Sequence, residues 1–165
     1  MATKLAPGPF VNAVWRSFLA DSGLEGRLLG DSFRITHATH GRVDFELDIK
    51  KHHTNRLGTL HGGTIASMVD LGGSLAVAST GRFATGVSTD LNVSYLSASG
   101  TPGSKVTGTA TCEKIGKTLA YTLVQFWNEK GQLSARGSHT KYVAGTIGPT
   151  KPEFVAPKEF TEGVE

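Results

Sequence analysis

The sequence has very little cysteine: among its 165 residues, Cys112 stands alone. One thiol forms no internal disulfide and cannot supply the thiolates of a structural zinc site, so a small secreted fold held by disulfides is excluded. We therefore expect an intracellular protein, cytoplasmic or mitochondrial. The first 20 residues carry cations but no acid, which fits either an organellar transit peptide or a short amphipathic helix.

Long apolar runs and a strong charge of one sign are also missing. No apolar stretch approaches the roughly 18 residues of a membrane span, so we expect none. The formal net charge is only +3, from 17 basic and 14 acidic residues dispersed along the chain. Even with a sequence pI near 9.1, this balance leaves no basic footprint, and we expect no nucleic-acid partner. A small ligand that carries phosphate stays possible.

Glycine, in contrast, is abundant. The chain has 21 glycines, nearly twice the usual fraction of about 7%, and they do not follow the third-position period of collagen. Together with the 38% of hydrophobic residues, they place the sequence near the globular norm. The length fits one domain, and the glycines imply many tight turns and close backbone contacts.

Hydrophobic periodicity predicts the elements of the first third of the chain. Apolar residues spaced by three and four predict an amphipathic helix over residues 10–20, ended by Gly23 and Gly26. A strand is expected over residues 27–37. It leads through a turn into a second strand over residues 42–50, where apolar and polar residues alternate, so the two form a half-buried antiparallel hairpin.

The rest of the domain is expected to hold one long helix and then strands only. The helix, over residues 62–79, carries large apolar residues on one face and Gly, Ala, Ser and Asp70 on the other. Alternation and turn residues predict four further strands, over residues 87–95, 105–112, 119–127 and 133–143.

This order of elements predicts an α+β fold in which a hairpin and a four-strand meander wrap around the long helix. A single sheet of this size leaves an edge and part of the helix uncovered, so we expect a homo-oligomer. The expected boundaries are a flexible N-terminus over residues 1–9, a domain over residues 10–144, and an irregular, proline-containing extension over residues 145–165.

The segment 52–63 carries the densest set of candidate functional residues and runs into the N-terminus of the long helix. Backbone N–H groups are unpaired there and the helix dipole is positive. Gly62 could offer its N–H to a carbonyl oxygen that becomes negative during acyl transfer, with His61 and Asn55 orienting it. Alternatively, Gly62 and Gly63 only permit a tight turn and His61 caps the helix.

Asp70 lies about two helical turns further on, with no cation three or four positions away. A buried lone carboxylate is costly unless it is hydrogen-bonded or functional. Ser88, on the polar face of the next strand, could position a water molecule against it. A carboxylate base, a hydroxyl that holds water and an oxyanion donor form a hydrolytic set. The alternative is that Asp70 is a solvated surface residue.

Three other patterns do not carry a function. Residues 116–118 read GKT, like the end of a phosphate-binding loop, but the required glycine is Thr111 and the segment lies in a hairpin turn. Residues 61–63 read HGG, as in some α/β-hydrolases, yet no G-x-S-x-G motif follows. The paired histidines lack the number and spacing of zinc ligands, so no metal is expected.

Several motifs in continuous order resemble a known family. They read HTNxxGTLHGG over 53–63, then Asp70, GVSxDxNxxY over 86–95, GKTLA over 116–120 and HTK over 139–141. Over roughly residues 10–144, the sequence is similar to the hotdog-fold acyl-coenzyme A thioesterases of the PaaI-like group. The resemblance implies a sheet wrapped around one central helix, dimers joined into a continuous sheet, and homotetramers in many members.

The resemblance also implies roles for single residues in the hydrolysis of an acyl-CoA to a carboxylic acid and free coenzyme A. Asp70 would be the general base or the nucleophile, and Ser88 would help to place the water or the substrate. The N–H of Gly62 from the partner subunit would polarise the thioester carbonyl, and Asn55 and His61 would shape its loop. The residues expected near coenzyme A are Ser88, Asp90, Tyr95, Leu96, Ser97, Lys114, Gly116, Lys117, Thr118, Leu119 and Tyr142.

The sequence departs from the family pattern at two places, and both affect the coenzyme A contacts more than the chemistry. The loop over residues 96–103 is one residue longer than the corresponding loop of a similar family member and lacks the lysine of that loop. Tyr142 stands where a histidine is found there. Besides a thioesterase without metal or other cofactor, two alternatives stay open. They are a dehydratase or hydratase of the same fold, and a non-catalytic protein that binds acyl-CoA or acts as a scaffold.

Overall fold

The structure is a computed structural model that describes residues 3–147 and 154–162. Its α-helices are α1 (Pro7–Asp21), α2 (Gly23–Leu28) and α3 (Gly62–Ala78), and its short 3-10 helices are η1 (Gly30–Ser32), η2 (Lys51–His53) and η3 (Lys158–Phe160). Its strands are β1 (Thr3–Lys4), β2 (Phe33–Thr39), β3 (Arg42–Asp48), β4 (Val87–Tyr95), β5 (Lys105–Ile115), β6 (Leu119–Trp127), β7 (Leu133–Tyr142) and β8 (Val155–Ala156). Within the described ranges, no helix is long and apolar enough to cross a membrane.

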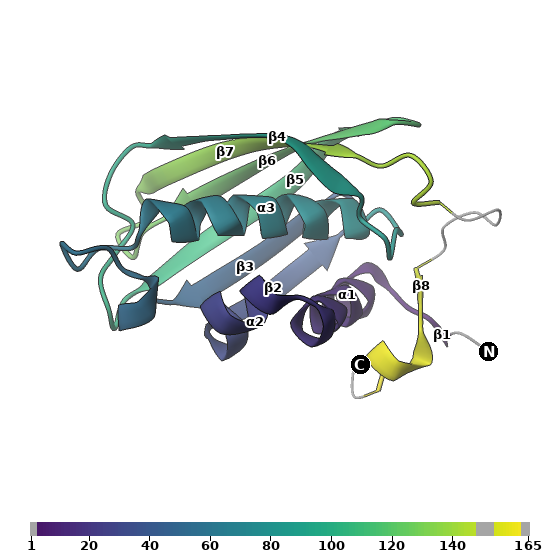
Figure 1. Ribbon diagram of the computed structural model, residues 1–165, viewed down its shortest axis with the longest axis horizontal. Coiled ribbons are helices and arrows are strands. Elements are labelled where there is room, and N and C mark those ends of the chain that lie inside the picture. Colours follow the sequence, from purple (N-terminus) through teal and green to yellow (C-terminus); the bar gives the residue numbers. More distant parts are fainter. Residues whose placement is uncertain (1–2, 148–153, 163–165) are drawn as a thin grey trace.

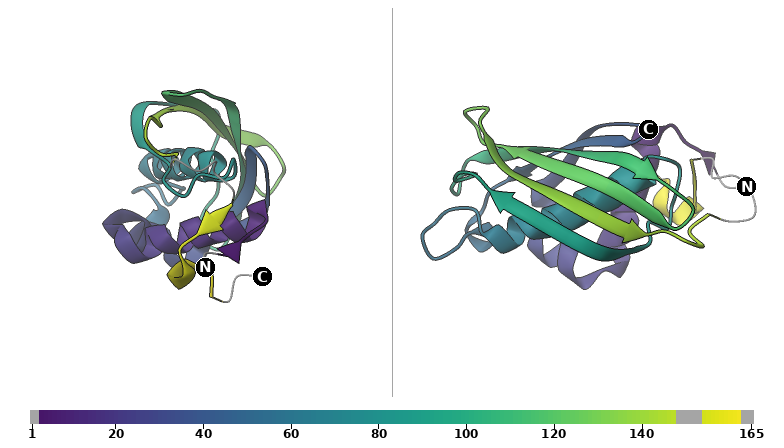
Figure 2. Two further views of the ribbon diagram at one scale, coloured as in Figure 1. Left: turned by 90° about the vertical axis from the view of Figure 1, so that its right-hand side faces the viewer. Right: turned by 90° about the horizontal axis from the view of Figure 1, so that it is seen from above.

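The six long strands form one antiparallel sheet in the order β2-β3-β5-β6-β7-β4. Helix α3 lies across the concave face of this sheet (Figure 1). The view along the helix in Figure 2 shows the sheet curving around it. The predicted α+β architecture, a sheet wrapped around one long helix with a short helix before it, is confirmed.

The predicted four-strand meander is wrong in one respect. Strands β5, β6 and β7 are consecutive neighbours, but β4 pairs with β7 at the far edge of the sheet, from Val87 opposite Tyr142 to Tyr95 opposite Ala135. The connection over residues 96–104 is longer than the roughly two to five residues of a hairpin loop. The chain therefore has enough length to cross from one edge of the sheet to its middle.

The predicted strand over residues 27–37 is also wrong at its start. Gly23 begins helix α2 and Gly26 lies within it, so these glycines do not end the helical region, and β2 begins only at Phe33. Glycine costs about 1 kcal/mol relative to alanine inside a helix. Leu29, the residue directly after α2, is buried in the core, and this contact offsets the cost.

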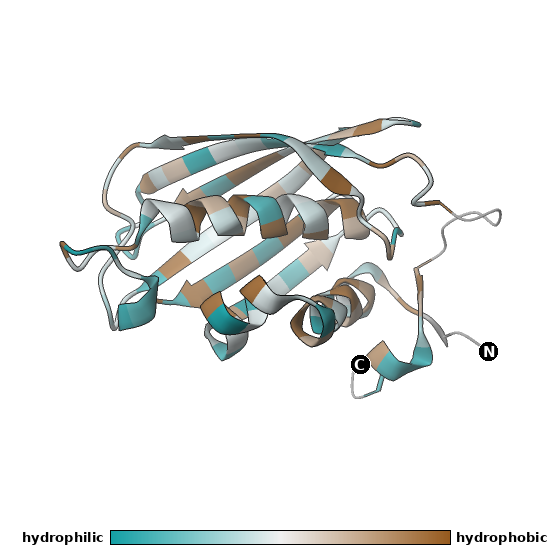
Figure 3. Ribbon diagram, in the orientation of Figure 1, coloured by the Kyte–Doolittle hydropathy of each residue, from teal (hydrophilic) through white to brown (hydrophobic). Residues whose placement is uncertain are grey.

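The core lies between α1, α3 and the concave face of the sheet. Its aromatic rings form a continuous row in which Trp15 and Phe45 each lie 5.0 Å from Phe33, centroid to centroid, and Phe126 follows 5.8 Å from Phe45. Figure 3 shows hydrophobic residues recurring along α1 and along the strands of the sheet. This row anchors the N-terminal helix against the sheet and leaves α3 in the middle.

The described part of the extension 145–165 is not irregular throughout. Strand β8 pairs with β1, so that Ala156 lies opposite Thr3, and the ring of Phe154 packs edge-on against Phe10 at 5.5 Å. The ring of Phe160 stacks on Phe83 at 5.8 Å. This segment, residues 154–162, packs beside the N-terminal part of the chain, where helix α1 begins at Pro7. Residues 148–153 and 163–165 of the extension lie outside the described residues.

Candidate functional site

Asp70 lies in the middle of α3 and is linked by hydrogen bonds to two strands. Ser88 Oγ, on β4, donates to Asp70 Oδ2 at 3.1 Å. His139 Nε2, on β7, lies 2.8 Å from the same Ser88 Oγ. Because the hydroxyl proton of Ser88 goes to the carboxylate, the bond to His139 requires the proton to be on Nε2. The structure thus brings together the predicted pair Asp70 and Ser88 and adds His139.

The ring of His139 is fully buried and is held close to α3. Burial, followed by the positive charge of Lys141, lowers the pKa of His139 to about 4, so the ring is neutral at pH 7. Its Nδ1 is a buried side-chain atom that finds no hydrogen-bond partner among the described residues. A Cβ atom added to Gly73 would lie only 2.3 Å from this Nδ1. Glycine at position 73 is therefore what allows helix and ring to approach.

Lys141 lies two residues after His139, on the same face of β7. It is only 2% exposed, and its Nζ donates to Ser74 Oγ at 2.8 Å. Ser74 Oγ in turn donates to the backbone carbonyl of Asp70 at 3.0 Å. Burial lowers the pKa of Lys141, and the charge of Asp70 opposes that shift. Lys141 forms no ion pair with the part of the chain that the structure describes.

The start of α3 shows the helix cap that the alternative interpretation assigned to His61. Its Nδ1 accepts the N–H of Gly63 at 2.7 Å. The hydroxyl of Tyr95 donates to the carbonyl of Gly62 at 2.8 Å, and a Cβ at Gly62 would lie 3.2 Å from the Tyr95 ring. The N–H of Gly62 has no acceptor within the described residues. The cap and a free N–H at Gly62 therefore coexist.

Asn55 organises its own loop. Its Oδ1 accepts the N–H groups of Leu57 at 2.9 Å and Thr59 at 3.2 Å, and its Nδ2 donates to the Thr59 hydroxyl at 2.9 Å. The side chain has no bond to Gly62. Asn55 thus shapes the loop before the helix, and the structure does not place it at the Gly62 N–H within one chain.

Gly62 and Asp70 are too far apart in one chain to act on the same carbonyl group. Both belong to α3, and eight residues at about 1.5 Å each separate them by roughly 12 Å along the helix. One carbonyl group fits within hydrogen-bonding distance of only one of them. The candidate residues of one chain therefore form two separate clusters, the Asp70 half-site and the Gly62 half-site.

The residues predicted to contact coenzyme A also fall into two groups in one chain. Those near the Asp70 half-site, where β4 begins and β7 ends, are Ser88, Asp90, Leu119 and Tyr142, with Lys114 near the end of β5 and the turn residues Gly116, Lys117 and Thr118 beside them. Those at the other end of β4 are Tyr95, Leu96 and Ser97. At roughly 3.3 Å per residue, Ser88 and Tyr95 are about 23 Å apart.

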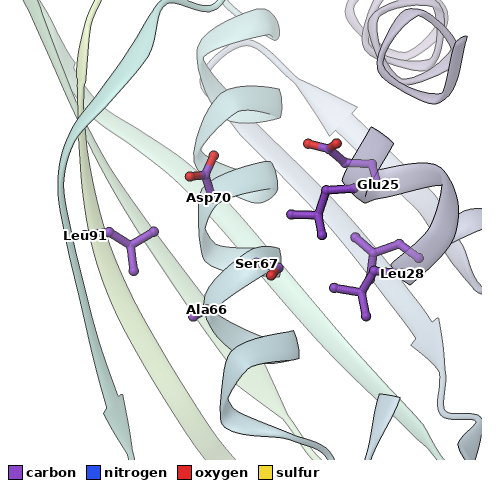
Figure 4. Close-up of a pocket in the computed structure, with 8 residues that line it drawn as sticks. Glu25, Leu28, Ala66, Ser67, Asp70 and Leu91 are labelled. Carbon is purple, nitrogen blue, oxygen red and sulfur yellow. The ribbon is translucent and has the colours of Figure 1, made fainter. Parts of the chain in front are cut away.

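A cavity of about 280 Å³ opens between α2 and α3. Its walls are mainly apolar and are formed by Leu24, Glu25, Leu28, Leu29, Ala66, Ser67, Asp70 and Leu91. Figure 4 shows Asp70, Ser67 and Ala66 along α3, opposite Glu25 and Leu28. The candidate base thus borders an apolar cavity, and α2, which forms one wall, is the helix that the sequence did not predict.

Neither His139 nor Lys141 is among the site residues predicted from the sequence, although both belong to the motif HTK over residues 139–141. The alternation along β7 held a usable signal, because residues 135, 137, 139 and 141 share one face and two of them are small. Polar side chains on a face that must pack against α3 need partners. As for metal ligands, no group of three His, Cys, Asp or Glu side chains suited to a metal occurs in residues 3–147 and 154–162.

Comparisons with known proteins agree on one family. A family model described as the thioesterase superfamily matches residues 57–135. Human acyl-coenzyme A thioesterase 13 is 42% identical over 118 residues, which cover 71% of this chain and 83% of that protein. The crystal structure of zebrafish thioesterase superfamily member 2 matches with a TM-score of 0.74 and 36% identity, over 81% of this chain and 96% of that one.

A more distant structure shares the fold. The Escherichia coli PaaI protein matches with a TM-score of 0.67 over 84% of this chain and 99% of that one, at 20% identity. These matches confirm the hotdog fold and the expected likeness to PaaI. With its sheet, its central helix and these relatives, the chain belongs to the thioesterase superfamily and is a thioester hydrolase.

Proposed function

We propose that the protein hydrolyses acyl-coenzyme A thioesters to a carboxylic acid and free coenzyme A. The observation that carries the proposal is the hydrogen-bonded series Asp70, Ser88 and His139 beside an apolar cavity. The name of the human relative, acyl-coenzyme A thioesterase 13, supports the same substrate class. The reaction needs water and no metal or redox cofactor.

Asp70 is proposed to act on the thioester carbonyl from one side. As a general base, its carboxylate accepts a proton from water while the water oxygen bonds to the carbonyl carbon. The tetrahedral intermediate then collapses, the C–S bond breaks and the thiolate of coenzyme A leaves. Since Ser88 already donates to Oδ2, Oδ1 is the oxygen left for the water. Direct attack by Asp70 as a nucleophile is the other route open to the same residue.

The oxyanion donor is proposed to come from a second copy of the chain. Strand β4 lies at the edge of the sheet, and of its nine residues only Leu91 and Val93 are half-buried. Val87 is 63% exposed and Tyr95 is 54% exposed. A long open edge of this kind is suited to pairing with another strand.

An antiparallel pairing of β4 with β4 of a second copy joins the two half-sites. The Ser88 end of one strand then lies beside the Tyr95 end of the other, and Tyr95 holds the carbonyl of Gly62. The Gly62 N–H of the partner comes near Asp70, while the two groups of coenzyme A candidates meet. We therefore propose a homodimer with two complete sites, and a homotetramer as its further assembly.

The proposed substrate lies across this junction. Lys114, near the end of β5, and Lys117, in the turn after it, are exposed near Tyr142 and can pair with the phosphates of coenzyme A. The acyl group enters the cavity between α2 and α3, whose leucine side chains suit an alkyl or aryl chain. The thioester between the two then lies at Asp70.

Replacing Asp70 with asparagine tests the proposal. Loss of a general base is expected to lower kcat by about 10²- to 10⁴-fold, measured as thiol release from acyl-CoAs of graded chain length. Asp31→Asn, an exposed aspartate on η1, is the matched control and should keep the wild-type rate. Equal turnover by Asp70→Asn and the wild type would refute the role of Asp70. No thiol release by the wild type from any alkyl or aryl thioester would favour the non-catalytic alternative.

A further inference from the structure

Helix α2 forms one wall of the apolar cavity, but it is not itself buried. None of its six residues is buried, and a helix of this length is too short to be stable alone. Leu29, directly after it, packs in the core. The last carbonyl groups of a helix have no donor within that helix, and one of those in α2 belongs to Leu28, whose side chain lines the cavity. The position of this wall therefore depends on contacts at the end of α2.

The ring of His53, on η2, contacts that end of α2. Its Nε2 lies 2.8 Å from the carbonyl oxygen of Leu28, and its Nδ1 accepts the backbone N–H of Lys50 at 2.9 Å. Because Nδ1 accepts, the proton of the neutral ring is on Nε2, which donates to Leu28. Burial lowers the pKa of His53, which favours this neutral form. The fully buried ring thus joins α2 to η2 with both of its nitrogens.

The neighbouring His52 is a weaker support for the same carbonyl group. Its Nε2 lies 3.2 Å from the Leu28 oxygen, and its ring packs 4.0 Å from that of His53, centroid to centroid. The side chain of His52 is exposed, so water competes for its hydrogen bond. A hydrogen bond in the interior is electrostatically stronger than one in water. The buried ring of His53 is therefore the main polar contact of Leu28.

The backbone of His53 has a different set of contacts. Its carbonyl oxygen accepts the hydroxyl of Thr64 at 3.0 Å and the N–H of His61 at 2.9 Å. These two residues flank Gly62 at the start of α3. The side chain of His53 thus holds the cavity wall, whereas its backbone holds the Gly62 half-site. A substitution at position 53 removes the first set of contacts and keeps the second.

We propose that His53 is a positioning residue that sets the width of the acyl cavity, because its ring fixes the end of α2. The proposal rests on the proposed function, in which the acyl group lies between α2 and α3. Without this hydrogen bond, Leu28 moves away from α3 and a long acyl chain loses contact with the wall. His53 thus determines the preferred length of the acyl chain and leaves the chemistry at Asp70 unchanged.

Two substitutions separate the two nitrogens of the ring. The amide of asparagine reaches the place of Nδ1, so His53→Asn keeps an acceptor for Lys50 and loses the donor to Leu28. The longer side chain in His53→Gln brings an amide N–H to the place of Nε2 and keeps that donor. His40→Asn, in the exposed turn between β2 and β3, is the matched control.

Two measurements are made on each protein. The first is kcat/KM, from thiol release by acyl-CoAs of graded chain length. The second is amide hydrogen exchange over residues 23–28, which form α2, and over residues 61–65 at the start of α3. The exchange measurement reports the attachment of α2 whether or not the protein is active.

His53→Asn is expected to lower the ratio of kcat/KM for long acyl chains to that for short ones about tenfold. Exchange over residues 23–28 should become about five- to tenfold faster, because one hydrogen bond is lost. The rate with the shortest acyl chain and the exchange over residues 61–65 should stay at the wild-type level. His53→Gln and His40→Asn should match the wild type in both measurements.

A wild-type chain-length ratio in His53→Asn would overturn the proposal, as would equal losses in His53→Asn and His53→Gln. Failure of His53→Asn to fold would also overturn it, since the ring would then hold the whole domain and not one wall. Unchanged exchange over residues 23–28 in His53→Asn overturns it even if the wild type is active. An inactive wild type with faster exchange in His53→Asn would instead overturn the proposed function, and with it the role of His53 in acyl selection.

Discussion

Replacing Gly73 with alanine tests how closely α3 packs against β7. The added Cβ would lie 2.3 Å from Nδ1 of His139 and 2.5 Å from the hydroxyl oxygen of Thr122. Ordinary contacts of this kind begin near 3.4 Å. The ring of His139 must therefore move by about 1 Å, or α3 must shift by a similar distance.

Gly73→Ala is expected to change the stability of the protein and its reaction rate by different amounts. Alanine gains about 1 kcal/mol of helix propensity over glycine, while overpacking a filled interior costs about 1–3 kcal/mol. The net loss of stability is then at most about 2 kcal/mol. The 2.8 Å bond between His139 and Ser88 does not survive a 1 Å displacement, and a misplacement of that size near reacting groups can cost about 10²-fold in rate. We expect kcat to fall by about 10- to 100-fold while the protein stays folded.

The assay combines thiol release from an acyl-CoA with urea unfolding of the same preparations. Gly8→Ala is the control, because Gly8 lies in α1 and a Cβ there meets nothing within 4 Å. It should gain stability, by up to about 1 kcal/mol, and keep the wild-type rate. A Gly73→Ala protein with the wild-type rate and increased stability would refute the reasoning, since both helix and ring would then have room.

Two further predictions concern the buried ring and the cavity. Because the folded-state pKa of His139 is about 4 and its unfolded value is near 6.5, its contribution to the free energy of unfolding is complete above pH 6.5 and is lost as the pH falls toward 4. The loss of unfolding free energy is up to about 3 kcal/mol. In urea unfolding at several pH values, the free energy of unfolding of His139→Gln should fall less steeply with decreasing pH than that of the wild type. The same pH dependence in both proteins would contradict this prediction. Leu28→Trp replaces an isobutyl side chain in the cavity wall with a bulky indole ring. It is expected to lower kcat/KM for long acyl chains about tenfold or more while sparing short ones. An unchanged chain-length profile would mean that the acyl group lies elsewhere.

The parts of the fold that the sequence predicted well are those in which hydrophobic residues recur at one constant spacing. The strands over residues 87–95 and 119–127 have the predicted bounds, and the helix over 62–79 ends one residue earlier, at Ala78. Alternation and helical spacing are local properties, so they identify elements without further information. They carry no information about neighbours, which is why the pairing of β4 with β7 was missed. Helix α2 was missed because its glycines outweighed the packing of Leu29 in any local estimate.

The candidate site was predictable in part for a similar reason. Asp70 stood out because no cation lies three or four positions away, and Ser88 because it lies on the polar face of a predicted strand. Their contact with His139 depends on which strand lies beside β4, and that follows from the order of the sheet alone. Lys141 is buried for the same reason, since β7 lies between two strands and faces α3. Chain order could not place these residues together.

The pairing of β1 with β8 has a practical consequence for engineering the chain. It brings the two ends of the described chain together beside α1, as Figure 1 shows. Ends that lie side by side can be joined by a short linker, and a new start can be opened in an exposed turn. The turn over residues 128–132, between β6 and β7, is such a place. A circular permutant cut there would keep every strand of the sheet, and it would leave the β4 edge free.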